Sequence, residues 1–416
     1  MAKNYTALTL IIIAGELIFS LPFHVTRYFK PTFLESFAIN NTVLGDAFAF
    51  YGLLALISYF PGGYLADKYS AKKLMALALF LTGAGGFFFA SFPDPGRLRF
   101  LYGFWGITTI LFFWGALIKY TSLWGGNESQ GKAFGYLEAG RGLVASVSSS
   151  FALLIFYFST DLENGVQSST KAIQNIIFYY SCLTIFIGLL ILVFLRENQF
   201  KKTKIISSQN KEKLQIYPVG LISIIIICAY CGFRSIDNAA LYLTEVGQLS
   251  ELEASTFITI LGYLRIVAAF AAGFIADKIT SAKLVTILFI VSMLTQSVLC
   301  GFFLQEFYQL ILICSNFVIM FLAIVSLRAV YFSLIEPVGI NSNRLGVCIG
   351  IISLVGFTPD IFFHSLTGRI LDANPGLVGH QNFYLATMIL SAIGLLTSLR
   401  LSNWIVKKKR YNFKNH

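Results

Sequence analysis

Charged residues are scarce in this 416-residue chain, where Asp, Glu, Lys and Arg together make up 12% of the sequence. Soluble domains are about a quarter charged. Hydrophobic residues account for 56% of the chain, and its mean hydropathy is +0.73. No soluble fold has enough interior to hide that much apolar surface from water. The composition therefore excludes a soluble enzyme, a disordered chain and a small secreted module, and it predicts a membrane protein.

Organised cysteines and catalytic motifs are also missing. The six cysteines all fall in apolar stretches without framework spacing, which predicts no disulfides. Cys228 and Cys231 form a C-x-x-C pair inside such a stretch, where packing is the expected role. The sequence has no glycine-rich nucleotide loop, no H-E-x-x-H and no triad spacing. We therefore expect no enzymatic activity, no cofactor and no metal.

Long apolar stretches dominate what is present. A bilayer core needs roughly 20 apolar residues per helix, and twelve windows meet this requirement. They lie near residues 7–33, 43–65, 74–92, 98–123, 132–158, 173–195, 217–243, 254–276, 284–304, 307–335, 346–370 and 382–404. Pro22 is expected to kink the first of them. The predicted fold is an all-α membrane protein with twelve transmembrane helices in two pseudo-symmetric six-helix bundles.

Basic residues indicate the domain boundaries and the orientation. Cytoplasmic loops retain Lys and Arg, and these residues are concentrated in a central polar stretch and in the C-terminal tail. We expect an N-terminal bundle at 1–195, a cytoplasmic linker at 196–215, a C-terminal bundle at 216–404 and a basic cytoplasmic tail at 405–416. Both termini then lie in the cytoplasm. The net charge of +11 lies mostly on one membrane face and calls for no nucleic-acid partner.

An internal repeat stands half the chain apart. Residues 63–73 read GYLADKYSAKK and residues 273–283 read GFIADKITSAK, each between two predicted spans. Duplicated six-helix halves are a transporter architecture, with the substrate site near the midplane of the membrane.

The repeat resembles the loop signature of the major facilitator superfamily, G-x-L-a-D-[RK]-x-G-[RK]-[RK]. The first copy departs from that signature at Ser70, where Gly is usual, and at Ala71, where a basic residue is usual. The resemblance covers the whole chain, because the number of spans, the central linker and both copies fall where the family has them. In the fourth span, Tyr102 stands where the family often has an Arg four residues before a Gly, here Gly106, so the proton-coupling role of that Arg is in doubt.

The resemblance implies a cytoplasmic latch that holds the outward-open state and breaks for inward opening. Its residues here are Gly63, Asp67, Lys68, Lys72, Gly273, Asp277 and Lys278. The two glycines have no side chain, so a neighbouring helix can approach closely. Asp67 can accept hydrogen bonds from helix N-terminal amides and pair with cations. The alternative is that Asp67 and its lysines form a simple polar turn.

Ionisable residues inside the spans are the substrate-site candidates. Each costs about 2.5–3.5 kcal/mol to insert, so each is expected to face a cavity. We expect the substrate to be bound by Arg234 and Arg141, helped by Arg328 and Arg27, with Asp237 and Glu138 poising these arginines in the empty state. Guanidinium groups bind phosphate or carboxylate bidentately and stay charged. A basic cavity of this kind favours an anionic cargo.

Two stretches are similar to the organophosphate:phosphate antiporter group of the superfamily. One runs from Arg234 to Val246 and the other covers residues 131–142, where Arg141 takes roughly the place of a family histidine that faces the substrate. Arg27 sits further along its span than the corresponding family Arg, which is a departure from that group.

Structural roles remain open for several of these residues. Arg27 and Lys119 lie near span ends, where long side chains can reach the membrane interface. Glu138 and Arg141, like Arg234 and Asp237, are i,i+3 neighbours that could neutralise each other. Arg265 has no basic counterpart half the chain earlier, so it could form an ion pair with a residue on another helix. Glu336 is a candidate gate or helix cap.

Acidic groups in the spans are candidates for coupling. Glu16, and Asp360 with His364 one turn further, could carry a proton. The pair of Asp360 and His364 could equally be a satisfied hydrogen bond.

The leading functional hypothesis is a monomeric secondary active transporter in the bacterial inner membrane. Its cargo would be a small anionic or zwitterionic organic metabolite, phosphorylated or carboxylated, with a proton or phosphate as coupling ion. An alternative is a proton-coupled importer of a neutral or zwitterionic nutrient such as an amino acid or nucleoside. A third is a membrane receptor or scaffold that transports nothing.

Overall fold

A computed structural model describes residues 5–125, 130–161, 166–195, 216–301, 309–338 and 342–414. The predicted linker at 196–215 and the last two residues of the predicted tail lie outside this described part. Within it the chain is helical and contains no strand. Twelve helices there are long and apolar enough to cross a membrane, which confirms the predicted all-α membrane fold.

The helices follow one another with few interruptions. The first half contains α1 (Tyr5–Leu17), the π-helix η1 (Ser20–His24), α2 (Val25–Tyr28), α3 (Lys30–Ser36), α4 (Asn41–Lys68), α5 (Ala71–Phe89), α6 (Pro95–Ile107), the π-helix η2 (Thr108–Trp114), α7 (Gly115–Gly125), α8 (Gln130–Asp161) and α9 (Val166–Phe194). The second half contains α10 (Ile216–Ser235), the 3-10 helix η3 (Ile236–Asn238), α11 (Ala239–Glu245), α12 (Glu251–Ile279), α13 (Ser281–Leu299), α14 (Gln309–Val330), the 3-10 helix η4 (Tyr331–Leu334), α15 (Ile335–Val338), α16 (Ser342–Gly356), α17 (Pro359–Ala373) and α18 (Leu377–Lys414).

The predicted windows agree with the observed spans to within a few residues. The largest differences are five residues, at the ends of the first and ninth spans, Tyr28 and Leu299, and at the start of the twelfth, Leu377. After Tyr28 the first span is followed directly by α3. There the chain turns, and α3 begins at Lys30 with a proline in its first turn. Proline is suited to the start of a helix, because N–H groups in the first turn have no acceptor within the helix and the lack of one costs nothing.

Pro22 changes the geometry of the first span, as the sequence predicted. Because Pro22 has no N–H to donate to the preceding turn, the helix widens into the π-helical turn η1. The turn joins α1 to α2 and changes which side chains face one another along this span.

Side-chain caps determine where three helices of the first half begin. The side chains of Asn40, Ser70 and Asp94 accept hydrogen bonds from backbone N–H groups three residues further on. Such caps satisfy amides that the first helical turn leaves without partners. Ser70, the departure from the loop signature, is thus the N-cap of α5.

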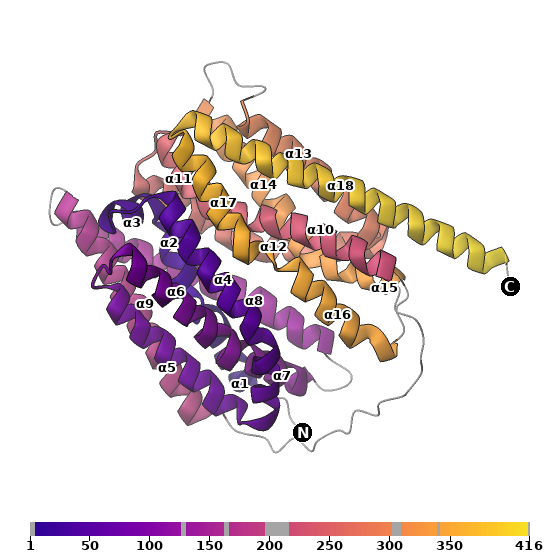
Figure 1. Ribbon diagram of the computed structural model, residues 1–416, viewed down its shortest axis with the longest axis horizontal. Coiled ribbons are helices and arrows are strands. Elements are labelled where there is room, and N and C mark those ends of the chain that lie inside the picture. Colours follow the sequence, from indigo (N-terminus) through magenta and orange to yellow (C-terminus); the bar gives the residue numbers. More distant parts are fainter. Residues whose placement is uncertain are drawn as a thin grey trace. The chain divides into compact units, whose positions relative to one another are not determined.

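The chain divides into two compact units. Unit 1 comprises Met1–Lys201, Asp237–Ile266 and Asp360–Asp372, and unit 2 comprises Lys202–Ile236, Val267–Pro359 and Ala373–His416. Unit 1 therefore contains the first six spans and two segments from the second half. Within it α4 runs beside α6 and α5 beside α9 (Figure 1). The bundle boundaries expected from the linker stay a prediction.

Each unit has its own apolar core. In unit 1 the core includes Leu8, Met75 and Phe113, and in unit 2 it includes Ile222 and Phe289, all nearly or fully buried. Lipid-facing positions are apolar as well, so both faces of many helices are hydrophobic, as expected for helices with a lipid neighbour.

Glycines bring α4 and α17 into backbone contact within unit 1. A Cβ at Gly45 would overlap the carbonyl oxygen of His364, and one at Gly52 would overlap that of Asp360. Conversely, a Cβ at Gly368 would overlap the carbonyl oxygen of Asn41. Small residues at these positions permit the close crossing that drives helix association in lipid.

Replacing Gly52 with leucine should separate α4 from α17. Overpacking of this kind costs about 1–3 kcal/mol, which is about a 5- to 150-fold change in population. Cysteines at Asp46 and Ser365, whose side chains are 2.6 Å apart, should therefore crosslink at least about fivefold more slowly in G52L.

The matched control is G135L, because a Cβ at Gly135 meets nothing within 4 Å. Crosslinking in G135L should proceed at the parent rate. Equal rates in G52L and G135L would show that the crossing does not depend on the missing side chain.

Candidate functional site

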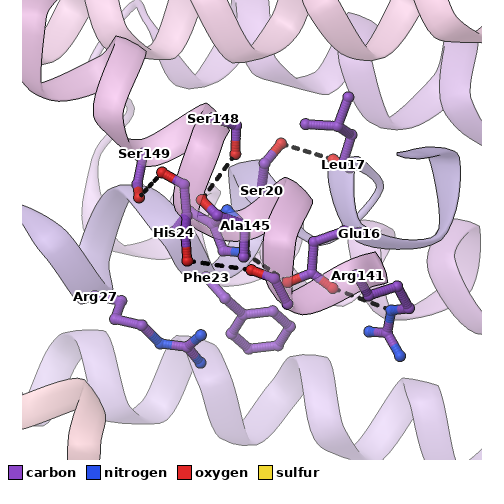
Figure 2. Close-up of polar contacts among 12 residues, drawn as sticks. Glu16, Leu17, Ser20, Phe23, His24, Arg27, Arg141, Ala145, Ser148 and Ser149 are labelled. Atoms are coloured by element: carbon purple, nitrogen blue, oxygen red, sulfur yellow. Dashed lines mark hydrogen bonds and ion pairs between the residues drawn. The ribbon is translucent and has the colours of Figure 1, made fainter. Parts of the chain in front are cut away.

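A cluster of mostly buried ionisable side chains lies inside unit 1. It consists of Glu16 on α1, His24 in η1, Glu138 and Arg141 on α8, and Arg265 on α12. Three separate spans thus bring ionisable side chains to one place. We call these five residues the charge cluster, and Figure 2 shows its centre around Glu16 and Arg141.

The ion pair between Arg141 and Glu16 is the centre of the charge cluster. Nε of Arg141 donates to Oε2 of Glu16 at 3.0 Å, and the two side chains are 8% and 5% exposed. Arg141 also donates through Nη1 to Oε1 of Glu138 at 2.9 Å. Its guanidinium lies 5.6 Å from the ring centre of Phe19 and 5.5 Å from that of Trp114. One guanidinium is therefore held by two carboxylates and two aromatic rings.

Glu138 differs from Glu16 in its exposure. Its side chain is 50% exposed, and its other oxygen lies 3.8 Å from Nη2 of Arg265. The predicted i,i+3 contact between Glu138 and Arg141 is present, and Arg265 pairs across helices as one reading of the sequence expected. The Glu138 carboxylate is thus shared by Arg141 and Arg265, and half of its side chain remains exposed.

His24 is the member of the cluster that the sequence analysis missed. Its Nε2 lies 3.2 Å from Oε1 of Glu16, eight residues earlier on the same span. Its Nδ1 is buried and has no hydrogen-bond partner among the described residues. An ideal helix would not place these two residues face to face, but the π-helical turn at Pro22 does. A histidine two residues after a predicted kink was the available signal.

A second group of polar contacts joins α2, α3 and α4 to η3, α12 and α17 within unit 1. Nε of Arg27 donates to Oδ1 of Asp237 at 2.5 Å, and the ring of His364 lies 3.6 Å from Oδ2 of the same carboxylate. Nζ of Lys30 donates to Oδ1 of Asn238. The predicted contact partner of Asp237 was Arg234, so its pairing with Arg27 adds a link that the i,i+3 rule could not supply.

Further contacts of this group lie along the same elements. Glu251 accepts hydrogen bonds from the backbone and hydroxyl of Thr32. Asp372 accepts from the backbone N–H groups of Asn41 and Thr42, at 3.2 and 2.6 Å, and so caps the start of α4. Asp46 binds Arg369 at 2.8 Å.

We name this group the outer clamp, because the predicted topology puts the ends of these helices outside. Its residues are Arg27, Lys30, Thr32, Asn41, Thr42, Asp46, Asp237, Asn238, Glu251, His364, Ser365, Arg369 and Asp372.

The remaining predicted substrate residues lie in unit 2. The guanidinium of Arg234 lies 5.2 Å from the ring centre of Tyr230, and that of Arg328 lies 4.0 Å from the ring centre of Phe233. Arg234 is buried and Arg328 is partly buried. Stacking on an aromatic face suits a guanidinium, which is weakly hydrated and planar.

His364 and Asp360 occupy different surroundings on α17. The ring of His364 stacks on Phe48 at 4.5 Å between centres and faces Asp237. Asp360 is partly buried at the start of α17. Their predicted role in proton coupling, like that of Glu16, stays a prediction.

The predicted latch residues make few contacts within their own units. Nζ of Lys119 donates to the Ala66 carbonyl at 2.5 Å and lies 3.6 Å from Asp67, whose side chain is 84% exposed. A Cβ added at Gly63 would meet no described atom of unit 1 within 4 Å, and one added at Gly273 would meet none of unit 2. The close approach of a neighbouring helix at these glycines stays a prediction.

The two latch lysines beside the aspartates lie on aromatic rings. Lys68 lies 5.8 Å from the ring centre of Tyr64, and Lys278 lies 4.4 Å from that of Phe274. Lys72 and Asp277 belong to the first turn of α5 and the last turns of α12. The latch function stays a prediction.

Comparison with known proteins identifies the family. Residues 12–357 match the model of the Major Facilitator Superfamily. The protein therefore belongs to the Major Facilitator Superfamily and is a transporter rather than an enzyme. This result confirms the resemblance read from the loop repeat.

Two curated relatives cover nearly the whole chain. The chain is 26% identical to inner membrane protein YihN of Escherichia coli strain K12, over 98% of this chain and 97% of the relative. It is also 26% identical to inner membrane protein YqcE of the same organism, over 95% of this chain and 93% of the relative. With the twelve apolar helices, these relatives support a multi-pass inner membrane protein.

Solved structures share the fold. A bacterial homolog of the human lysosomal transporter Spinster, in an inward-facing and occupied conformation, has a TM-score of 0.73 and 14% identity over 96% of both chains. A variant of the nucleoside transporter NupG has a TM-score of 0.71 and 12% identity, over 95% of this chain and 99% of that one. A D-xylose-proton symporter has a TM-score of 0.69 and 16% identity, over 95% of this chain and 97% of that one.

The pair of Glu16 and Arg141 should be strongly coupled in stability. Removing one partner leaves the other charge buried and unpaired, which costs about 3–5 kcal/mol. We expect E16Q and R141Q each to lower the free energy of unfolding in detergent by about that amount, and the double variant to cost less than the sum of the two.

The control is the exposed pair of Arg97 and Asp94, whose side chains are 73% and 56% exposed at 3.1 Å. Its coupling should be about 0–1 kcal/mol. A coupling of the Glu16 pair no larger than that of the control would contradict the assignment.

Proposed function

We propose that this transporter moves a small anionic or zwitterionic organic metabolite, carboxylated or phosphorylated, across the cytoplasmic membrane by alternating access. In this proposal both termini are cytoplasmic, the protein acts as a monomer, and a proton or phosphate serves as coupling ion. The similarity to the organophosphate:phosphate antiporter group favours phosphate exchange. Arg141, Arg27, Arg234 and Arg328 bind the anion.

The observation that carries the proposal is the half-exposed Glu138 on a buried arginine. Arg141 is held from one side by buried Glu16 and from the other by Glu138. A carboxylate on a substrate has the same geometry and charge as the Glu138 side chain, and a phosphate likewise offers two anionic oxygens to a guanidinium. Substrate can therefore replace Glu138 on Arg141 while Glu16 keeps the guanidinium in place.

Buried guanidinium groups are present in both units. Arg27, Arg141 and Arg265 are largely buried in unit 1, where they pair with Glu16, Glu138 and Asp237. Arg234 and Arg328 lie on aromatic rings in unit 2. Guanidinium groups stay charged and are suited to bind carboxylate or phosphate bidentately, which supports an anionic cargo.

A thermal-shift screen of the purified protein against phosphorylated sugars, carboxylates, amino acids and nucleosides identifies the ligand class. A ligand that binds the folded state raises the unfolding temperature. We expect carboxylates or phosphate esters to raise it, R141A and R234A to abolish both the shift and uptake into proteoliposomes, and E138Q to bind the ligand more tightly.

The matched control is R97A, which removes an exposed arginine from the start of α6. It should bind and transport like the parent. Undiminished uptake by inserted and folded R234A and R141A would overturn the substrate site, and a shift only with nucleosides would overturn the substrate class.

A second candidate function is proton-coupled import of a neutral or zwitterionic nutrient. The contact between His24 and Glu16 favours it, because a carboxylate and an imidazole in hydrogen-bond reach can exchange a proton. Here Glu16 or Asp360 carries the proton and the arginines are structural.

Collapse of the pH gradient distinguishes the two functions. An anion exchanger loaded with counter-substrate should keep its uptake rate when a protonophore is added, because exchange does not depend on proton movement. A proton-coupled importer should lose concentrative uptake, and E16Q should be insensitive to the protonophore. If exchange against counter-substrate stopped when the pH gradient was collapsed, the anion-exchange proposal would be contradicted.

A further inference from the structure

Lys30 is a buried cation with no part in the proposed substrate site. It lies at the start of α3, outside the membrane spans, and is 7% exposed. Its Nζ donates a hydrogen bond to Oδ1 of Asn238 in η3. Lysine is almost never buried without a specific partner, because taking an ammonium group out of water is costly.

A small cavity lies beside Lys30 within unit 1. Its volume is about 10 Å³, which is room for a single water molecule. The lining includes Lys30, Asn238, Asn41, His364 and the backbone at Gly45. Nδ2 of Asn238 and Oδ1 of Asn41 are buried and have no hydrogen-bond partner among the described residues. A water molecule in this cavity would accept a hydrogen bond from Nδ2 of Asn238 and donate one to Oδ1 of Asn41.

The charged groups that act on Lys30 lie on η3, α11 and α17. Asp237, Asp372 and Glu245 attract its ammonium, and burial opposes them. Arg27 and His364, which both lie beside Asp237, are two further titratable groups of the outer clamp. Burial is the larger effect and lowers the pKa of Lys30 to about 8.

We propose that Lys30 is a proton-binding residue that couples closure of the outer clamp to the proton concentration outside. This inference rests on the alternating access and orientation of the proposed function but not on its cargo. When the clamp opens, water reaches Lys30 and the amine binds its proton firmly. When the clamp closes, the amine is moved into the cavity beside Asn238 and holds the proton weakly. Neutral Lys30 can still donate to Asn238 and accept from the cavity water.

The direction of the effect follows from linkage. An exposed lysine has a pKa near 10.4, whereas the pKa of Lys30 in the closed clamp is about 8. Between these values the open state holds one more proton than the closed state, so raising the pH favours closure. Between pH 7 and pH 9 the ratio of open to closed protein should fall about tenfold.

The test measures opening of the clamp directly. Spin labels on cysteines at Leu53 of α4 and Leu366 of α17, both exposed apolar side chains outside the clamp, report the separation of the two helices in lipid nanodiscs. Cys182, Cys300 and Cys314, the cysteines that are not buried, are replaced by serine. Electron–electron distance distributions from pH 6 to pH 10, without any cargo, give the fraction of open protein.

In the labelled protein with Lys30 unchanged, the parent, long distances report the open clamp and short distances the closed one. Between pH 7 and pH 9 we expect the ratio of open to closed protein to fall about tenfold. K30R stays charged at every pH tested and should show no such fall. K30Q carries no charge, so it should be closed at pH 7 and independent of pH. K73Q, which alters an exposed lysine at the N-terminal end of α5, should behave like the parent.

A parent distribution that does not change with pH would overturn the proposal, and so would a fall that persists in K30R or K30Q. Because the measurement uses no substrate, its result is independent of whether the proposed cargo is correct. Conversely, a failed ligand screen with the expected pH response would reject the cargo and leave the role of Lys30 intact.

Discussion

The structure depends on the rule that a charge buried among membrane helices must have a partner. Arg141 satisfies this rule through Glu16, with both side chains more than nine-tenths buried. Removing water from two such groups is costly, and only close geometry with further hydrogen bonds repays that cost. The requirement connects α1, η1, α8 and α12 and determines which side chains surround the candidate site. A buried ion pair is weak evidence for stability, because apolar residues of similar volume often serve as well, and we therefore propose a use in transport for this one.

The charge cluster and the outer clamp of unit 1 differ in what their carboxylates contact. The charge cluster contains one carboxylate, Glu138, that is half exposed, and in the proposed function the substrate replaces it. The outer clamp contains carboxylates that accept from backbone amides and cap helix ends, as Asp372 does for α4. A cap of this kind depends on the position of a whole helix. The clamp is therefore suited to respond to movement of α17, and the cluster to respond to a ligand.

Much of the fold could be predicted from hydropathy, because a bilayer demands long apolar helices and the sequence carries twelve of them. The contact of Glu138 with Arg141 could also be predicted, since i,i+3 neighbours share a helix face. Other features depend on tertiary structure. His24 reaches Glu16 only because a π-helical turn shifts the register at Pro22. Lys30 meets Asn238, and Arg27 meets Asp237, across more than half of the sequence. The glycines in contact, Gly45 and Gly52, were not distinguishable by pattern from Gly63, which lies in open space within its unit.

The central claim is that a substrate anion replaces Glu138 on Arg141. The most direct measurement is calorimetric binding of a matched pair of ligands, a carboxylate and its neutral amide, to the intact transporter. A charge-assisted bidentate contact contributes about 1.5–3 kcal/mol, so the carboxylate should bind at least about tenfold more tightly, and E138Q should widen the difference. Equal affinities, or tighter binding of the amide, would contradict the account.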